Sequence, residues 1–183
     1  MKKSIFLSTI LLILTGIIFG NLDSEKVDAS SESNQPFIKQ VPKEVKGTWY
    51  WCSKSNTKNN VVHKEIINAK KLKFHPYKKH TLYFLNPYKS PKTSKQKAYY
   101  KKTINWTWEF KSRAGKQTWY TFDQWQRFIG VGLSLNVSKH NGHRVLTMAS
   151  RSALAVFRHC YKTPALAKQM GQKHYRGFYY DKF

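Results

Sequence analysis

Acidic residues are scarce in this chain: nine Asp and Glu stand against 33 Lys and Arg in 183 residues, a formal net charge of +24. Residues 1–29 contain three basic and three acidic residues, so the rest of the chain carries the whole positive excess. A charge balance of this kind informs about partners and not about fold. The carboxylates beyond residue 29 are spread along the chain: Glu32, Glu44, Glu65, Glu109, Asp123 and Asp181.

Motifs that carry catalysis are also lacking. Sugar hydrolysis needs two carboxylates that face one bond. Glu109 and Asp123 would approach each other across a predicted hairpin, but the pattern favours Glu109 on the solvent side of its strand and Asp123 in a turn. The sequence has no Gly-x-Ser-x-Gly elbow and no phosphate-cradling glycine loop, and its histidines have no acidic or thiolate partner at the spacing of a zinc motif. We therefore predict a protein that is not an enzyme and has neither metal nor cofactor.

Cysteine is limited to Cys52 and Cys160. In an oxidising compartment these two allow one disulfide that closes a long loop, worth roughly 4–5 kcal/mol in the chain-entropy model. Two buried thiols are the alternative. Neither cysteine looks catalytic, because nothing in the sequence fixes a base beside it.

Long uncharged apolar runs are limited to one, Ile5–Leu22, which follows two N-terminal lysines. Val27 and Ala29 then place compact residues three and one positions before a cut after Ala29, as in secretory signal peptides. We predict a signal peptide over 1–29. The alternative is an uncleaved membrane anchor, since the run approaches the roughly 20 residues of a spanning helix. Either way, we expect the rest of the chain to be extracellular, secreted or associated with the cell surface.

A strongly basic protein outside the cell first meets anionic surfaces: teichoic acids, phospholipid headgroups, acidic polysaccharide or shed nucleic acid. Binding to them should weaken with salt, because exposed charges are screened over about 8 Å at physiological ionic strength. No specific nucleic-acid target is implied, and lysines that only keep a sheet-rich protein soluble are the alternative. The lysines expected to form the contact surface occur in pairs and runs: Lys70, Lys71, Lys78, Lys79, Lys92, Lys95, Lys97, Lys101 and Lys102.

All six tryptophans lie beyond residue 29, which argues against a disordered basic tail. Aromatic rings beside lysines can stack on sugar rings or on bases. The tryptophans that we consider for ligand contact or stacking are Trp49, Trp106, Trp108 and Trp119. Tryptophans at every second position are also typical of the core face of a sheet, and that alternative stays open.

Apolar residues alternate at period two more often than at helical period from Val41 onward. Asn141-Gly142 is the strongest local signal, because this pair adopts the positive φ angles of a type I′ hairpin turn. The run 153–161 favours a strand, although its alanines also permit a helix. Strands are predicted near 49–52, 71–75, 81–85, 106–110, 118–122, 133–137, 145–149 and 175–180, with a turn at 113–116 and a mobile loop over 86–97.

A short helix is predicted over Pro164–Met170. Thr163 can cap it, Pro164 occupies the first helical position and Gly171 follows its end. The sequence therefore predicts a mainly β fold, a small antiparallel barrel or meander with a short C-terminal helix, preceded by a signal peptide. In this division residues 1–29 are the signal peptide, 30–40 a flexible tether and 41–183 a basic β-rich domain.

The segment Val41–Tyr50, which ends in Gly-Thr-Trp-Tyr, resembles the opening of a large set of small, uncharacterised secreted proteins of lactobacilli and their relatives. The segment Tyr161–Tyr180 is similar to their C-terminal end, with Leu-Ala-Lys at 166–168 and Tyr-Arg-Gly-Phe at 175–178. The resemblance implies export from a Gram-positive cell and a small, mostly β domain. It supplies no activity.

Gly47-x-Trp49 also resembles the first-strand motif of lipocalins, in which a tryptophan closes the barrel floor under an arginine of the last barrel strand. Arg158, which precedes the predicted helix, fits that order better than Arg176. The resemblance implies a barrel interior that holds a small apolar ligand. Side chains that fill a small barrel are the alternative. The interior residues would be Trp51, Leu135 or Phe157.

The leading hypothesis is a secreted, strongly basic, non-catalytic binding protein that is retained at the bacterial cell envelope through anionic polymer, either teichoic acid or acidic polysaccharide. The second is a lipocalin-like carrier of a small apolar ligand. A third is a cationic factor that acts on the anionic membranes of competing cells.

Overall fold

The computed structural model describes residues 37–54, 60–77, 91–126 and 132–181, all of which belong to one compact unit, Gln35–Phe183. Within these residues no helix is long and apolar enough to cross a membrane. Several predicted features lie outside the described residues: the signal peptide, tether residues 30–36, Lys78, Lys79, the strand at 81–85 and loop residues 86–90.

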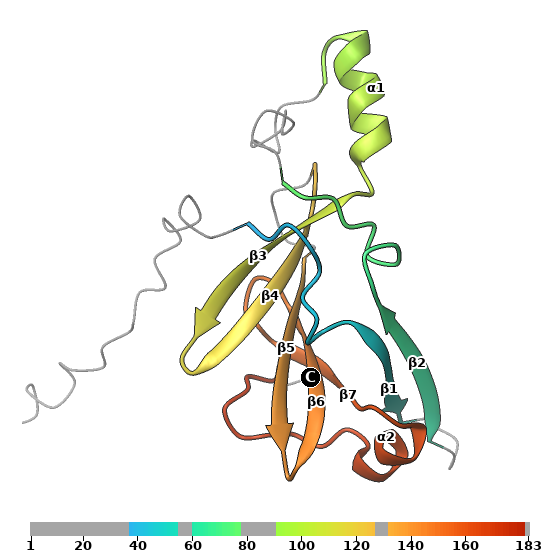
Figure 1. Cartoon of the computed structure of the whole chain (residues 1–183), viewed down its shortest axis with the longest axis vertical. Helices are drawn as coiled ribbons and strands as arrows, with labels where there is room; N and C mark the ends of the chain where they lie inside the picture. The colour runs from blue at the N-terminus through green and yellow to red at the C-terminus, as the bar shows by residue number, and fades with distance from the viewer. Residues whose placement is uncertain (1–36, 55–59, 78–90, 127–131, 182–183) are drawn as a thin grey trace, which may run out of the picture. The chain divides into compact units, whose positions relative to one another are not determined.

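The fold is mainly β and has two antiparallel sheets (Figure 1). The strands are β1 Gly47–Ser53, β2 Val61–Ile67, β3 Thr107–Ala114, β4 Gln117–Gln124, β5 Leu133–His140, β6 His143–Ser150 and β7 Val156–Cys160. The larger sheet has the order β3-β4-β5-β6-β7, and β1 pairs with β2 in the smaller one. This order confirms the predicted meander, and the strands do not close into a barrel.

Tight turns set the register of the two central hairpins. Asn141 and Gly142 have φ angles of 50° and 79°, as predicted for a type I′ turn, and His140 pairs with His143 across them. The turn between β3 and β4 lies at 115–116, where Gly115 has a φ of 55°. Glycine is favoured there because this left-handed conformation is costly for residues with a Cβ atom.

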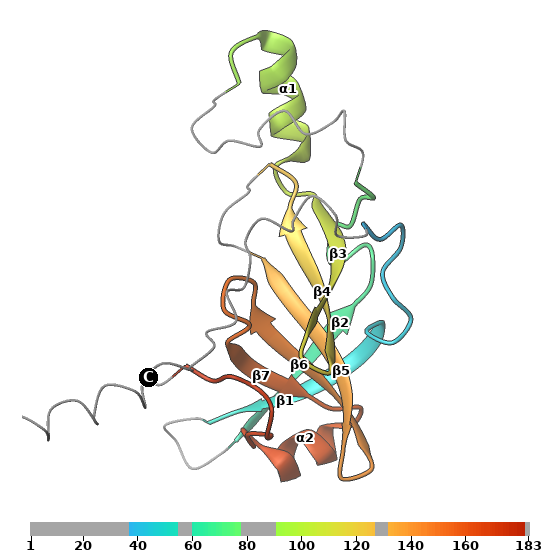
Figure 2. The same ribbon diagram turned by 90° about the vertical axis from the view of Figure 1, so that its left-hand side faces the viewer.

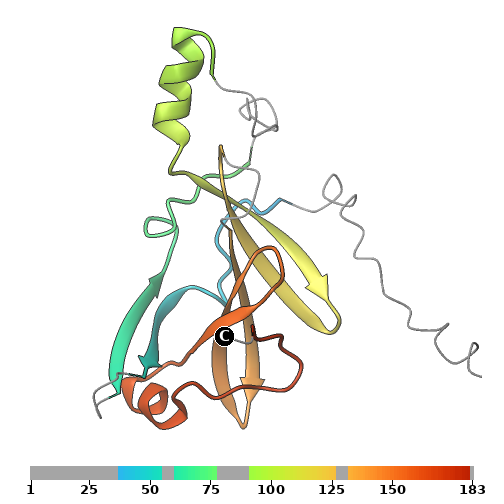
Figure 3. The ribbon, with the colours of Figure 1, turned by 180° about the vertical axis from the view of Figure 1, so that it is seen from behind.

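The two sheets are joined where β1 meets the end of β7. Tyr50 and Tyr161 form an antiparallel bridge with N···O distances of 2.8 and 2.7 Å. The helix α2, Pro164–Met170, follows at once and packs against β1 and β2 (Figure 3). Its cap confirms the prediction: the Thr163 side chain accepts from the backbone N–H of Leu166.

Both faces of the larger sheet are covered. The strands β1 and β2 lie along one face (Figure 2). There Trp49 and Ile67 pack with Leu135 and Leu146, and all four side chains are at most 1% exposed. On the other face, Phe178 and its neighbours cover a second cluster. Burial of a large apolar side chain contributes roughly 1.5–3 kcal/mol. Leu135, predicted to line a barrel cavity, therefore lies in a packed core.

Two of the predicted strands are wrong. Residues 71–73 form a turn, in which the Asn68 side chain accepts from the backbone N–H of Lys71 at 2.8 Å, and Phe74 makes a single parallel bridge to Thr107. Residues 175–180 contribute only the bridge of Tyr179 to Ala155. Apolar residues occur at every second position in both segments, as in a strand. Local turns nevertheless bring these side chains to the core, and neither segment forms a continuous ladder of hydrogen bonds with a neighbouring strand.

A second helix, α1 (Ser94–Thr103), occupies part of the predicted mobile loop. Thr93 and Gln96 form a capping box, in which each side chain accepts from the other's backbone N–H.

The boundary between the predicted tether and the folded domain also differs from the prediction. Phe37, placed in the predicted tether, already pairs with Phe110 and stacks on Tyr77 at 3.9 Å, so the folded part begins before Val41.

Candidate anion-binding surface

Three of the four tryptophans considered for ligand contact lie in the core. Trp49, Trp108 and Trp119 are 0%, 8% and 1% exposed. Trp49 donates its indole N–H to the Val45 carbonyl at 2.8 Å, and Trp108 packs against Phe110. These residues are the core face of their strands, so the ligand prediction is wrong for them.

The cation over Trp49 also differs from the lipocalin expectation. The ammonium nitrogen of Lys162 lies 3.3 Å from the Trp49 ring centroid, whereas the Arg158 guanidinium lies 3.8 Å from the Trp51 ring. Of the residues expected inside a barrel, Trp51 is half-buried and Phe157 is exposed. The arrangement does not favour the carrier hypothesis.

Trp106 is the predicted tryptophan that remains accessible. It is half-buried just before β3 and stacks on the His75 ring, with centroids 3.6 Å apart and an interplanar angle of 12°. Its other ring contact is edge-on, with Trp125 at 5.9 Å. Burial lowers the pKa of His75 below its ordinary value, which favours a neutral imidazole in the stack.

This ring pair lies in a pocket of about 480 Å³ that also contains three lysines. Lys70 and Lys73 come from the turn after β2, and Lys102 comes from the last turn of α1. We call these five residues the lysine pocket: Lys70, Lys73, His75, Lys102 and Trp106. The prediction included Lys70, Lys102 and Trp106. It missed Lys73, which belongs to none of the lysine pairs and runs, and it missed His75.

The turn that carries Lys70 and Lys73 is fixed to the start of β3. The backbone N–H of Thr107 donates to the Lys73 carbonyl at 3.0 Å, and His75 donates to the Thr107 carbonyl at 2.7 Å. The Thr107 hydroxyl donates to the Leu72 carbonyl at 2.6 Å. These bonds hold the lysines beside the ring pair, although their side chains are exposed.

The other predicted lysines do not all face this pocket. In a helix of 3.6 residues per turn, Lys95 and Lys102 share one face, while Lys97 and Lys101 lie on the opposite side. Lys95 therefore lies on the same side of α1 as Lys102, about two turns from it along the helix. Two further lysines are exposed elsewhere: Lys92, ahead of the helix, and Lys71, beside a separate hollow.

Four of the five carboxyl groups of the described residues have partners, whereas Glu109 is buried without a hydrogen-bond partner. Glu65 pairs with Arg158 at 3.5 Å, and Asp123 pairs with Arg151 at 2.8 Å. The remaining partners are tyrosines: Tyr120 donates to Glu44, which lowers the pKa of Glu44, and Tyr179 bonds to Asp181. Among the described residues, no ion pair involves a lysine of the lysine pocket.

Glu109 and Asp123 do not form a catalytic pair. Glu109 pairs with Phe122 and Trp108 with Asp123, so the two carboxylates lie on opposite faces of the hairpin. Both belong to strands and are at most 1% exposed, which corrects the predicted solvent and turn positions. Burial, followed by the Glu44 charge, raises the pKa of Glu109 to about 8.

Cys52 and Cys160 are both buried free thiols, so the disulfide alternative is wrong. The bridge between Tyr50 and Tyr161 places these tyrosines on one face. Cys52 shares that face because it lies two residues from Tyr50. Cys160 adjoins Tyr161 and points to the other face, where its thiol contacts the Met148 sulfur at 3.6 Å.

Groups of three or more His, Cys, Asp and Glu that could hold a metal do not occur among residues 37–54, 60–77, 91–126 and 132–181. The surface thus offers ammonium groups and a ring pair as its chemistry. These can bind anionic groups and contact flat ligands. No protein-family model, curated protein or solved structure matches this chain.

Proposed function

We propose that this chain is a secreted, non-catalytic binding protein that stays at the bacterial cell envelope by binding an anionic polymer, teichoic acid or acidic polysaccharide. The lysine pocket is its contact site, and Lys95 extends that site along α1. The observation that carries the proposal is that these lysines have no carboxylate partner among the described residues.

The pocket suits a charged polymer better than a small ion. Each exposed ammonium contributes little by itself, because an exposed ion pair is typically worth only about 0–1 kcal/mol. Several ammonium groups along a polymer act together, since each further contact forms at high effective concentration. The Trp106–His75 pair adds an aromatic surface for a sugar unit of the polymer.

The test is a salt titration of residues 30–183 on purified cell walls, with and without their teichoic acid or acidic polysaccharide. We expect binding that falls steeply with added salt and is lost when the anionic polymer is removed. Binding that is independent of salt, or unchanged after removal of the polymer, would contradict the proposal.

A charge-reversal variant locates the site. Lys70→Glu, Lys73→Glu and Lys102→Glu together should weaken wall binding at least tenfold, about 1.4 kcal/mol. The matched control reverses three exposed lysines elsewhere: Lys116, Lys139 and Lys168. Both variants have the same net charge. Equal losses in the two would show that total charge, and not the lysine pocket, determines binding.

A further inference from the structure

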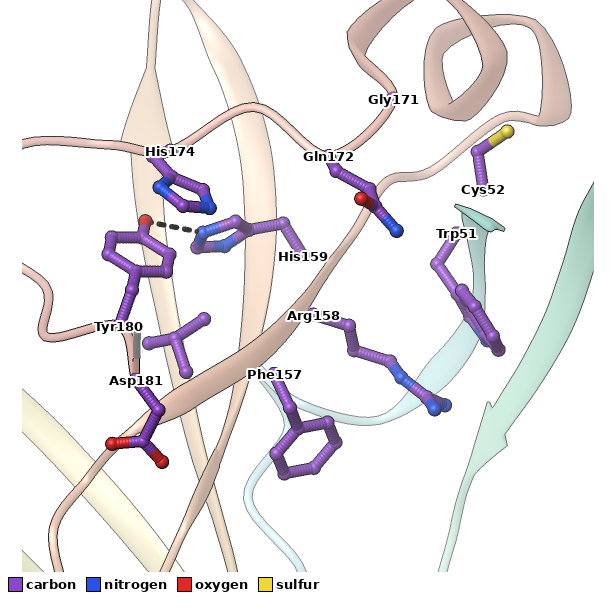
Figure 4. Close-up of a pocket in the computed structure, with 11 residues that line it drawn as sticks. Trp51, Cys52, Phe157, Arg158, His159, Gly171, Gln172, His174, Tyr180 and Asp181 are labelled. Atoms are coloured by element: carbon purple, nitrogen blue, oxygen red, sulfur yellow. Dashed lines mark hydrogen bonds between the residues drawn. The ribbon is translucent and has the colours of Figure 1, made fainter. Parts of the chain in front are cut away.

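A second pocket, of about 280 Å³, lies between β7, the end of β1 and the segment that follows α2 (Figure 4). It is separate from the lysine pocket, and none of its lining residues is a lysine. Its wall combines aromatic rings with several hydrogen-bonding groups. The residues that carry the argument are Trp51, Phe157, Arg158, Gln172, His174 and Asp181.

One ring of this wall, Phe157, is open to a ligand, whereas the Trp51 ring stacks on His63 at 4.1 Å and lies under Arg158. Phe157 is 53% exposed, although it belongs to a strand whose neighbours are largely buried. Trp51 is half-buried. The Arg158 guanidinium lies 3.8 Å from the Trp51 ring centroid and 5.3 Å from the Phe157 ring centroid. Figure 4 shows Phe157 and Trp51 on either side of the Arg158 side chain.

The opposite wall is held rigidly by a chain of hydrogen bonds and ring contacts. His159 Nε2 and the Tyr180 hydroxyl are 2.8 Å apart, and His159 Nδ1 is 3.0 Å from the Thr147 hydroxyl (Figure 4). His174 stacks on Tyr180 with centroids 3.8 Å apart and an interplanar angle of 7°. Burial lowers the pKa of His159 to about 4, so its ring is a neutral support.

The charged groups at this second pocket are one guanidinium and two carboxylates, unlike the three lysines of the lysine pocket. Arg158 is paired with Glu65 at 3.5 Å, and Asp181 adds a further carboxylate to the lining. Arg158 Nε is buried and has no acceptor among the described residues. Gln172, His174 and Asp181 are exposed at the rim, where their donors and acceptors can reach a ligand.

We infer that this pocket binds a neutral hexopyranose, the six-membered ring of a common sugar. Such a ring has an apolar C–H face, which Phe157 can cover, and hydroxyl groups around its edge, which both donate and accept. Arg158 and Gln172 supply donors for these hydroxyls, and Asp181 supplies an acceptor. An acidic sugar is disfavoured, because Arg158 is already paired with Glu65 and the Asp181 carboxylate would repel a second anion.

The test follows the pocket by NMR while sugars are added to the purified protein. The probes are the methyl glycosides of glucose, galactose and N-acetylglucosamine, with glucuronic acid as the anionic comparison. We expect at least one neutral glycoside to shift the Trp51 indole and Phe157 ring signals, with millimolar affinity that high salt leaves unchanged. No shift with any neutral glycoside, or tighter binding of glucuronic acid, would overturn the inference.

Variants of Phe157 separate stacking from simple apolar contact. Phe157→Leu should weaken the sugar affinity about three- to tenfold, because it removes the ring, while Phe157→Tyr should retain it. Gln172→Ala should also weaken binding, with Gln169→Ala as a control on an exposed residue outside the pocket. Equal affinity in the Phe157→Leu and parent proteins would overturn the assignment of this site. Wall binding through the lysine pocket is measured separately, so failure of either proposal leaves the other standing.

Discussion

Glu109 is a carboxyl group in an unfavourable environment. It is 0% exposed in β3, and neither of its oxygens has a hydrogen-bond partner among the described residues. Ionisation there would leave an unpaired charge away from water, which is why burial raises its pKa to about 8. Glu44 adds to this effect and Lys46 opposes it. The group is therefore protonated in the folded protein at neutral pH.

Glu109 should make the protein less stable as pH rises. The unfolded chain loses this proton near pH 4.5, whereas the folded protein keeps it until about pH 8. The folded state thus binds more protons between these values, and the free energy of unfolding falls across that window. Glu109→Gln should remove this fall and stabilise the protein at pH 8 by roughly 2–5 kcal/mol.

Urea unfolding at a series of pH values measures this effect. Glu109→Asp is the matched control, because it keeps a buried carboxyl and should keep the pH dependence. A difference between the Gln variant and the parent protein that does not change between pH 4.5 and pH 8 would contradict the assignment.

The two helices differ in how much of the core depends on them. α2 places Ala167 in a cluster with Tyr161 and Tyr175, beside the junction of the two sheets. α1 also buries one residue, Thr103, which accepts a hydrogen bond from Gln126 at 2.6 Å, but no residue of α1 belongs to a core cluster of the described residues. α1 presents lysines at the lysine pocket, whereas α2 contributes to the fold.

Removal of the N-cap should therefore have different results in the two helices. Thr163→Ala should lower the global free energy of unfolding by about 0.5–2 kcal/mol, a typical cost of a lost N-cap. Thr93→Ala should leave global stability nearly unchanged and increase hydrogen exchange in the first turn of α1.

Thermal unfolding and hydrogen exchange of both variants distinguish these results. A similar loss of global stability in the two variants would mean that α1 belongs to the same cooperative unit as α2. The parent protein is the reference for both measurements.

Across the described residues, four carboxylates pair with arginines or tyrosines, and no ion pair involves a lysine. Arg158 pairs with Glu65, and Arg151 pairs with Asp123. Tyrosine hydroxyls form hydrogen bonds with two further carboxylates. With a formal net charge of +24, repulsion among the remaining cations opposes folding. The same excess charge favours association with an anionic polymer.

Screening of this repulsion should stabilise the protein. We expect the thermal midpoint to rise by a few degrees when sodium chloride is increased from low to physiological ionic strength, because repulsion between exposed lysines is reduced more than the two arginine pairs are weakened. Calorimetry at several salt concentrations measures this change. A midpoint that falls with salt would show that the ion pairs outweigh the repulsion.

Local patterns predicted much of the β architecture. Alternation of apolar residues located the hairpins, and Asn141-Gly142 located a turn, because these signals depend on neighbours in sequence. The cap residues Thr163 and Gly171 located α2 for the same reason. The pattern did not single out β2, and it missed α1, whose many lysines and lack of an acidic first turn obscured the capping box.

The candidate site was predicted only in part, because contacts distant in sequence build it. The lysine content was visible in the sequence, and Trp106 was one of four candidate tryptophans, but Lys73 and His75 join the site through hydrogen bonds to Thr107. Likewise, the alternating tryptophans did not reveal which ring stays accessible. That depends on which face of the larger sheet is covered.

The sequence by itself determined the positive charge, the alternating strands, the type I′ turn and the capped helix α2, since each follows from composition or from residues close in the chain. The tertiary structure alone decided that the sheet stays open, that Cys52 and Cys160 face apart, and that Glu109 is buried. It also decided which lysines meet around Trp106. The physical reason is that burial and pairing depend on long-range contacts, which a local pattern does not encode.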